Sequence, residues 1–172
     1  MICAAGGALL VIAGFLGWLS TATETGGRTT VSGFGSIGGD TTVVGGNLND
    51  LLDSSGLGGY RPGLVGLILG LIAIPTGIAV ALRRPAGGRA FRAAGVLLAV
   101  VGVTGLCWGL LRGFVPGTAG VLSPGDSRAA AGPWLTAAGG LLVFLAAGWL
   151  LLGRADPGRV EPAPSRRGIQ PG

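Results

Sequence analysis

The chain has 172 residues, of which 49% are hydrophobic and 11% charged, with a formal net charge of +5 and a mean hydropathy of +0.68. Because an average soluble domain carries about 25% charged residues, this composition excludes a soluble globular fold, and it is too apolar for a disordered chain. The sequence contains no histidine and no lysine, so the commonest general base and the commonest amine nucleophile are both missing. We therefore predict an integral membrane protein that is not an enzyme and binds no cofactor.

Four apolar stretches are long enough to form spanning helices, because a hydrocarbon core of about 30 Å requires about 20 residues at about 1.5 Å each. None of the four contains a charged side chain, and none shows the polar face with a 3.6-residue period that a helix of a soluble domain would show. The predicted fold is an all-α membrane protein with four transmembrane helices, at residues 1–20, 63–82, 93–111 and 134–152.

The first apolar stretch has an alternative interpretation as a secretory signal peptide, because it ends in the small residues 20–23. A basic flank at its start is missing, and its apolar run of about 18 residues exceeds the usual 7 to 15 of a signal peptide. The missing basic flank also leaves open that the chain begins further upstream. Cleavage would leave the orientation of the other three spans unchanged.

The arginines predict the orientation, because positive residues are retained on the cytoplasmic side. Eight of the 12 arginines lie in a short loop at residues 83–92 and in a tail at residues 153–172. The other two connections, at residues 21–62 and 112–133, hold most of the acids and are predicted to be extracytoplasmic. We expect a protein of the bacterial cytoplasmic membrane with both termini cytoplasmic and a disordered proline-rich tail. Orientation also explains the isoelectric point of about 11.0, so we expect no nucleic-acid partner.

Small residues recur along one face of the second and third spans, where close approach of helices in a membrane depends on them. The third span shows the spacing at Gly102, Gly105 and Gly109. We expect these two spans to pack against each other as a helical hairpin. The small-residue face of the second span consists of Gly63, Gly66, Gly70, Ala73 and Gly77.

Pro75 lies inside the second span, where it removes one backbone hydrogen bond. It is the candidate hinge of the protein, and the alternative is a fixed bend that neighbouring helices tolerate.

Aromatic residues lie within a turn or two of the predicted span ends, where amphipathic rings sit at the membrane surface. We expect them to be interfacial anchors rather than a binding cage. They are Trp18, Trp108, Trp134, Trp149 and Tyr60.

The first outer loop, rich in glycine and threonine, contains Gly38-Gly39 between two β-prone segments, at residues 29–37 and 40–44. A two-residue spacing of this kind is typical of a hairpin turn, so we expect a small β-hairpin there. Asn49 is the expected cap of a short helical turn that follows, lying on the membrane surface or the bundle top. Asn47, Asn49, Asp50 and Asp53 gather oxygen ligands, but their spacing does not match a calcium loop, so we predict no metal site.

The layout resembles a known class of small membrane proteins. The points of similarity are Gly132-Pro133-Trp134-Leu135, followed by the small and apolar residues 138–142, together with the succession of spans and loops. The chain is similar in these features to the actinobacterial tryptophan-operon-associated membrane protein family, whose members have four spans. It departs from the family at Gly17-Trp18-Leu19, where an arginine-then-tryptophan pair would end the first span. The resemblance implies a class and no biochemical activity.

These observations predict a structural or interaction partner of another membrane protein, in contact with membrane lipids. The alternative is a small channel or transporter subunit, with a narrow pore lined by Thr76, Thr104 and Thr136. Carriers and proton relays normally place ionisable groups within the bundle, whereas all 19 charges here lie outside the apolar stretches.

Overall fold

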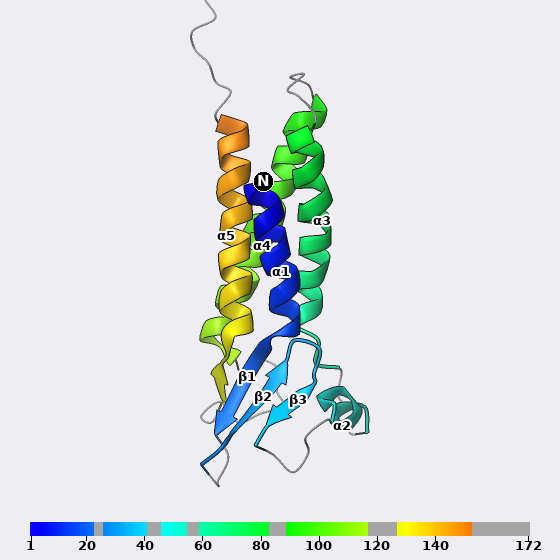
Figure 1. Ribbon diagram of the computed structural model, residues 1–172, viewed down its shortest axis with the longest axis vertical. Coiled ribbons are helices and arrows are strands. Elements are labelled where there is room, and N and C mark those ends of the chain that lie inside the picture. The colour runs from blue at the N-terminus through cyan, green and yellow to red at the C-terminus, as the bar shows by residue number, and fades with distance from the viewer. Residues whose placement is uncertain (23–25, 41–45, 55–58, 83–88, 117–126, 153–172) are drawn as a thin grey trace, which may run out of the picture.

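The computed structural model describes residues 1–22, 26–40, 46–54, 59–82, 89–116 and 127–152. In Figure 1 the long helices lie side by side, with a small sheet and a short helix at the same end of the bundle. In chain order the elements are α1 (Ile2–Phe15), β1 (Gly17–Ala22), β2 (Arg28–Ser32), β3 (Ile37–Gly39), α2 (Leu48–Ser54), α3 (Gly63–Leu82), α4 (Arg89–Phe114), β4 (Ser127–Ala129) and α5 (Ala131–Leu152).

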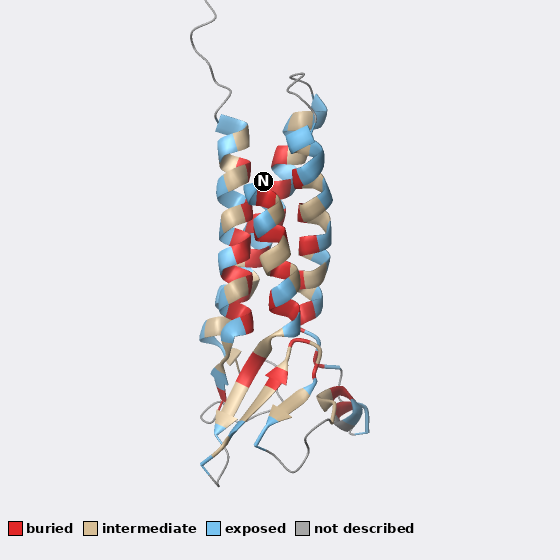
Figure 2. Cartoon of the chain, in the orientation of Figure 1, coloured by how far each residue is buried: buried red, intermediate tan, exposed pale blue. Residues whose placement is uncertain are grey.

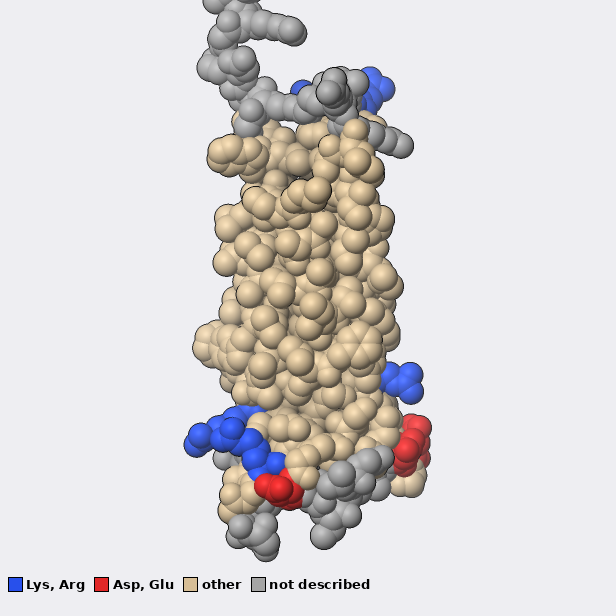
Figure 3. Space-filling view, in the orientation of Figure 1, with Lys and Arg blue, Asp and Glu red and all other residues tan. Residues whose placement is uncertain are grey.

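Three of the helices, α3, α4 and α5, are long and apolar enough to cross a membrane. The second predicted span coincides with α3, while α4 and α5 begin three to four residues before the third and fourth predicted spans. On the face seen in Figure 3 the shaft of the bundle carries no charged side chain, and charges gather at its two ends. The most hydrophobic parts of the sequence therefore form the three helices that could span a membrane. Residues 83–88 of the predicted cytoplasmic loop and the predicted disordered tail lie outside the described residues.

The prediction for the first span was wrong at its C-terminal end. Helix α1 has 14 residues, or about 21 Å of helix, and ends at Phe15; Leu16 is already extended, with φ −78° and ψ 169°. Residues from Gly17 onward form strand β1, in which pairing with two neighbouring strands satisfies the backbone. Hydropathy cannot separate the two elements, because an apolar strand that directly continues an apolar helix looks like one long segment.

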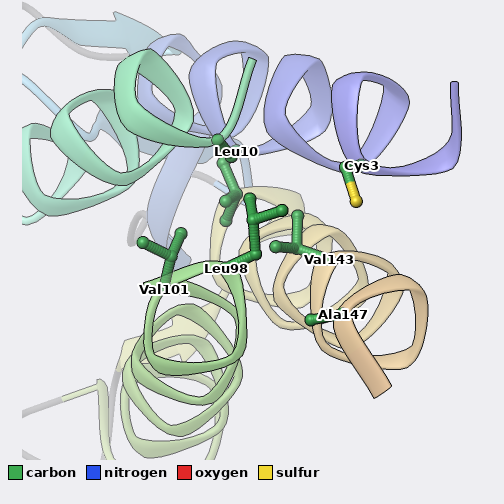
Figure 4. Close-up of a cluster of buried hydrophobic side chains, with 7 residues drawn as sticks. Cys3, Leu10, Leu98, Val101, Val143 and Ala147 are labelled. Carbon is green, nitrogen blue, oxygen red and sulfur yellow. The ribbon is translucent and has the colours of Figure 1, made fainter. Parts of the chain in front are cut away.

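The helices pack in a fixed pattern, with α1 against both α3 and α5, and α4 chiefly against α5. The side chains of Leu10, Leu98 and Val143 come from three different helices, and all three are fully buried. Figure 4 shows them pointing toward one another in the space between the helices, and Figure 2 shows buried positions along the inner faces. The centre of the bundle is therefore filled by aliphatic side chains.

The sheet is antiparallel, with the strand order β3-β2-β1-β4. Leu19 of β1 lies opposite Val31 of β2 on one side and Ala129 of β4 on the other, with a register shift between Gly17 and Leu19. The sheet therefore joins the segment after the first helix to the segment before the last. The predicted fold contained no counterpart of β1 or β4.

A hairpin is present in the first outer loop, but its turn lies elsewhere than expected. Strands β2 and β3 are joined by a turn at residues 33–36, in which Gly35 has a φ of 86°. Gly38 and Gly39, expected in the turn, belong to β3 and pair with Thr30 and Thr29. Most of the second predicted arm, at residues 41–44, lies outside the described residues.

One face of the sheet has its own small core. Leu19, Val31, Leu52 and Tyr60 are buried together, with Ile37 and Leu48 packed against them. Helix α2 therefore covers the sheet through Leu52 instead of lying on the membrane surface or the bundle top.

The sheet and the bundle are connected through the backbone of Gly33. Its N–H donates to the carbonyl oxygen of Leu16 at the end of α1 (3.1 Å), and its own carbonyl oxygen accepts from the N–H of Gly63 at the start of α3 (2.9 Å). A β-carbon on Gly33 would collide with the Gly14 carbonyl, the Trp18 indole and Gly63. This crowding fixes the β2–β3 turn against two helix ends at once.

Candidate functional site: the helix interfaces and the outer sheet

The small-residue face of the second span is a contact surface, but its partner is α1. All five of its residues are buried. A β-carbon on Gly66 would lie 2.9 Å from the carbonyl oxygen of Leu10, and one on Gly70 would lie 2.6 Å from that of Gly7. The expected pairing of the second and third spans as the main hairpin was therefore wrong, because α3 contacts α1 far more than α4.

The glycines of the third span face α5. Gly102, Gly105 and Gly109 are all buried. A β-carbon on Gly102 would meet the backbone of Phe144, and one on Gly109 would meet Pro133 and Ala137. The spacing thus identified a packed face, but spacing alone contains no information about which helix lies opposite.

Pro75, the candidate hinge, lies within α3, which runs as one helix from Gly63 to Leu82. Its side chain is exposed, whereas Ala73 and Gly77 are buried at the contact with α1. Pro75 therefore faces outward from the bundle and lines no interior space.

The three threonines weighed as pore-lining residues do not meet in the structure. Thr104 is exposed on α4, Thr76 is half-buried, and Thr136 is fully buried. The Thr136 hydroxyl donates to the Gly132 carbonyl oxygen one turn earlier, at 2.9 Å. Such a bond satisfies the hydroxyl within its own helix.

Two of the expected interfacial anchors are buried in the protein. Trp18 is 1% exposed, and its indole N–H donates to the Ala13 carbonyl oxygen at 2.8 Å. Gly132 leaves room for this indole, since a β-carbon there would lie 2.5 Å from ring atoms. Trp18 therefore fills the space where α1, β1 and α5 meet. Trp134 and Trp149 are exposed, as expected for anchors.

Tyr60 is the other buried aromatic residue of the expected set. Burial raises the pKa of its hydroxyl to about 12, against a smaller opposite effect of the Arg112 charge. Tyr60 is therefore neutral at physiological pH. The Arg112 guanidinium lies 4.8 Å from the ring centre of Trp108, whose indole N–H donates to the Pro62 carbonyl oxygen at 3.2 Å. Arg112 and Trp108 thus link α4 to the segment that leads into α3.

Asn49 is a buried connector and does not cap α2. The capping interaction comes from Asn47, whose side-chain oxygen accepts from the Asn49 N–H at 2.9 Å. The Asn49 side-chain amide instead donates to the Phe34 carbonyl oxygen (2.9 Å), and its oxygen accepts from the Tyr60 N–H (2.6 Å). One side chain therefore joins the β2–β3 turn, α2 and the segment before α3.

The oxygen-rich residues of this loop are engaged in those backbone contacts or face solvent. The amide oxygens of Asn47 and Asn49 each accept a backbone N–H, and Asp50 and Asp53 are exposed. Among the described residues, no group of three histidine, cysteine, aspartate or glutamate side chains could hold a metal ion.

A pocket of about 670 Å³ lies on the sheet face opposite the core formed by Leu19, Val31, Leu52 and Tyr60, and none of its residues was predicted to belong to a site. Two arginines on different strands line it, Arg28 of β2 and Arg128 of β4, together with the hydroxyl-bearing Ser20 and Thr30. The sequence carries little signal for this face, because neither β1 nor β2 alternates polar and apolar residues along its length.

No protein-family model matches the chain, and no curated protein matches it.

The close contact between α1 and α3 predicts that adding a single methyl group at Gly70 lowers the free energy of unfolding. Replacing Gly70 with Ala places a β-carbon against the Gly7 carbonyl, so the helices must separate locally, and overpacking of this kind costs about 1 to 3 kcal/mol. The same change at Gly148, where nothing lies within 4 Å of the new β-carbon, should leave stability unchanged or slightly higher. The measurement is unfolding of the purified protein in detergent; equal effects at the two positions would refute close packing at Gly70.

The Asn49 contacts predict a difference between two identical substitutions. Replacing Asn49 with Asp removes the donor to Phe34 in a buried site, which should lower the free energy of unfolding by about 1 to 3 kcal/mol. Replacing Asn47 with Asp keeps the capping oxygen and adds a negative charge in the first turn of α2, where it is tolerated. Thermal unfolding of both variants checks this; a larger loss at position 47 would contradict the assigned roles.

Proposed function

We propose that the chain is a four-span protein of the bacterial cytoplasmic membrane that acts as a structural or interaction partner of another membrane protein. Three spans are α3, α4 and α5, and α1 is proposed as the fourth. In support, Leu10 and Ala13 of α1 are fully buried, and α1 has α3 on one side and α5 on the other. A cleaved signal peptide would leave the glycines of α3 without the surface they fit.

The observation that carries the functional proposal is the filled centre of the bundle. Leu10, Leu98 and Val143 meet there with no exposed surface. A channel or carrier needs polar groups to replace the hydration of its cargo, and Thr104 lies on the outer surface of α4. This arrangement favours a packing or recognition role over the alternative of a channel or transporter subunit.

The part available for recognition outside the bilayer is the sheet with α2. Trp18 and Gly33 attach it to the helix ends, and Asn49 joins its turn and α2 to the segment before α3, so it presents a fixed surface. Rigid presentation lowers the entropy cost of binding a partner. Membership in the tryptophan-operon-associated family and an actinobacterial source stay predictions from the sequence resemblance.

The proposed orientation can be tested with single cysteines in a variant whose native Cys3 and Cys107 are replaced by Ala. Asp53 on α2 and Ala90 at the start of α4 are both exposed and lie at opposite ends of the protein. A membrane-impermeant maleimide should label Asp53→Cys on intact cells and Ala90→Cys only after permeabilisation. The reverse pattern would invert the topology.

If the chain has an interaction role, one defined partner protein should lie next to the sheet and α2. A photoreactive amino acid at Asp53 should give a defined protein adduct in native membranes, whereas the same group at Leu71, exposed on the apolar face of α3, should give none.

Ion flux through proteoliposomes tests the alternative of a channel or transporter subunit. The purified protein should pass no more sodium, potassium, chloride or protons than protein-free liposomes do. Flux above that level would overturn the structural role and favour the channel alternative.

A further inference from the structure

The pocket lies on the face of the sheet that α2 does not cover, and two arginines and two hydroxyl-bearing residues line it. It measures about 670 Å³ and is lined, among others, by Ser20, Ala22, Arg28, Thr30, Arg128 and Ala131.

The strand register brings its polar side chains onto one face. Ser20 of β1 lies directly opposite Thr30 of β2 and also opposite Arg128 of β4, while Ala22 lies opposite Arg28. Residues that face one another across neighbouring strands project to the same side of a sheet. Leu19 and Val31, which alternate with them, point into the core beneath α2. Arg28 and Arg128 therefore lie on either side of β1, which places only the Ser20 hydroxyl and the Ala22 methyl group on this face between them.

The charge of this pocket is positive. No aspartate or glutamate lines it among the described residues; Asp40 lies opposite Arg28 just after β3, with its N–H donating to the Arg28 carbonyl oxygen (3.1 Å), but it is exposed and not part of the lining. Ala131 is both a lining residue and the first residue of α5, so the positive end of a 22-residue helix dipole also faces this region. Two like charges at one pocket repel each other unless an anion lies between them.

The pocket also lies near the end of the uncharged part of the helix bundle. Ala131 begins α5, and Trp134, one turn further on, is exposed on the apolar surface. On the face seen in Figure 3, basic side chains lie where the uncharged shaft ends. In a bilayer this boundary is the level of the lipid headgroups.

We propose that this pocket binds a phosphate group carried by an anionic phospholipid headgroup, with Arg28 and Arg128 as its principal ligands and Ser20 as a hydroxyl donor. Arginine binds phosphate oxygens with two parallel hydrogen bonds, and two guanidiniums on separate strands can hold one phosphate from both sides. The inference requires only that the bundle lies in a membrane, and it does not depend on the interaction role. A soluble phosphate ester offers the same chemistry, so the experiment distinguishes the two sources.

The test uses the purified full-length protein in native mass spectrometry, titrated with phosphatidylglycerol and with zwitterionic phosphatidylcholine. Replacing both Arg28 and Arg128 with Gln should weaken phosphatidylglycerol binding at least about tenfold, because each charge-assisted hydrogen bond contributes strongly. The matched control replaces Arg61 and Arg89 with Gln, which removes the same charge from two exposed positions outside the pocket. Its affinity should change by less than about threefold, the scale expected for long-range charge alone.

Two further arms complete the experiment. Replacing both pocket arginines with Lys keeps the charge, so it should restore part of the affinity and show that the Gln variant failed through charge and not through misfolding. Glycerol phosphate at millimolar concentration should not raise the melting temperature of the protein in phosphatidylcholine nanodiscs; a rise that the Gln variant loses would assign the pocket to a soluble ester. Equal affinity for the two lipids, or equal losses in the pocket and control variants, would overturn the proposal.

Discussion

The backbones of α1 and α3 approach so closely that glycine hydrogens occupy the space where side chains would otherwise stand. β-Carbons on Gly63, Gly66 and Gly70 would lie within 2.6 to 2.9 Å of the carbonyl oxygens of Gly14, Leu10 and Gly7, respectively. The partners descend along α1 as the glycines ascend along α3, so the two helices run antiparallel in continuous contact. In lipid, where no hydrophobic effect drives helices together, this close contact maximises dispersion attraction.

The position of the sheet and α2 follows from that contact. Because Gly14 and Gly63 adjoin at the end of the α1–α3 contact, the chain must leave α1 there, and Gly33 bridges the gap with two backbone hydrogen bonds. Trp18 then fills the space beside it and rests against Gly132 at the start of α5. The backbones of α1 and α5 also approach closely on the side of α1 away from α3, where Gly6 and Gly139 face each other. The sheet is thus oriented by the same contacts that hold the bundle.

Sequence alone located the three helices that are long and apolar enough to span a membrane, and the buried face of α3, because hydropathy and a three-and-four-residue spacing are local signals. It failed for non-local features. The partner of the Gly70 face is set by a helix 60 residues earlier, and the three residues of β4 carry no strand signature of their own. Trp18 looked like an interfacial anchor because its burial depends on Gly132, far along the chain. The pocket arginines were counted only as loop charges, since nothing near Arg28 in sequence indicates that Arg128 lies two strands away.

The pairing of Leu19 with Ala129 has a consequence for biosynthesis, because about 110 residues separate the two strands. A chain made from its N-terminus can join β1 to β2 soon after both emerge; in the proposed orientation the other edge of β1 must wait until β4, which follows α4, has crossed the membrane. Until then the nascent protein carries an open strand edge outside the bilayer and a glycine-lined α1 surface without its second helix. In that orientation, completion of the native state is therefore coupled to insertion of the last helix.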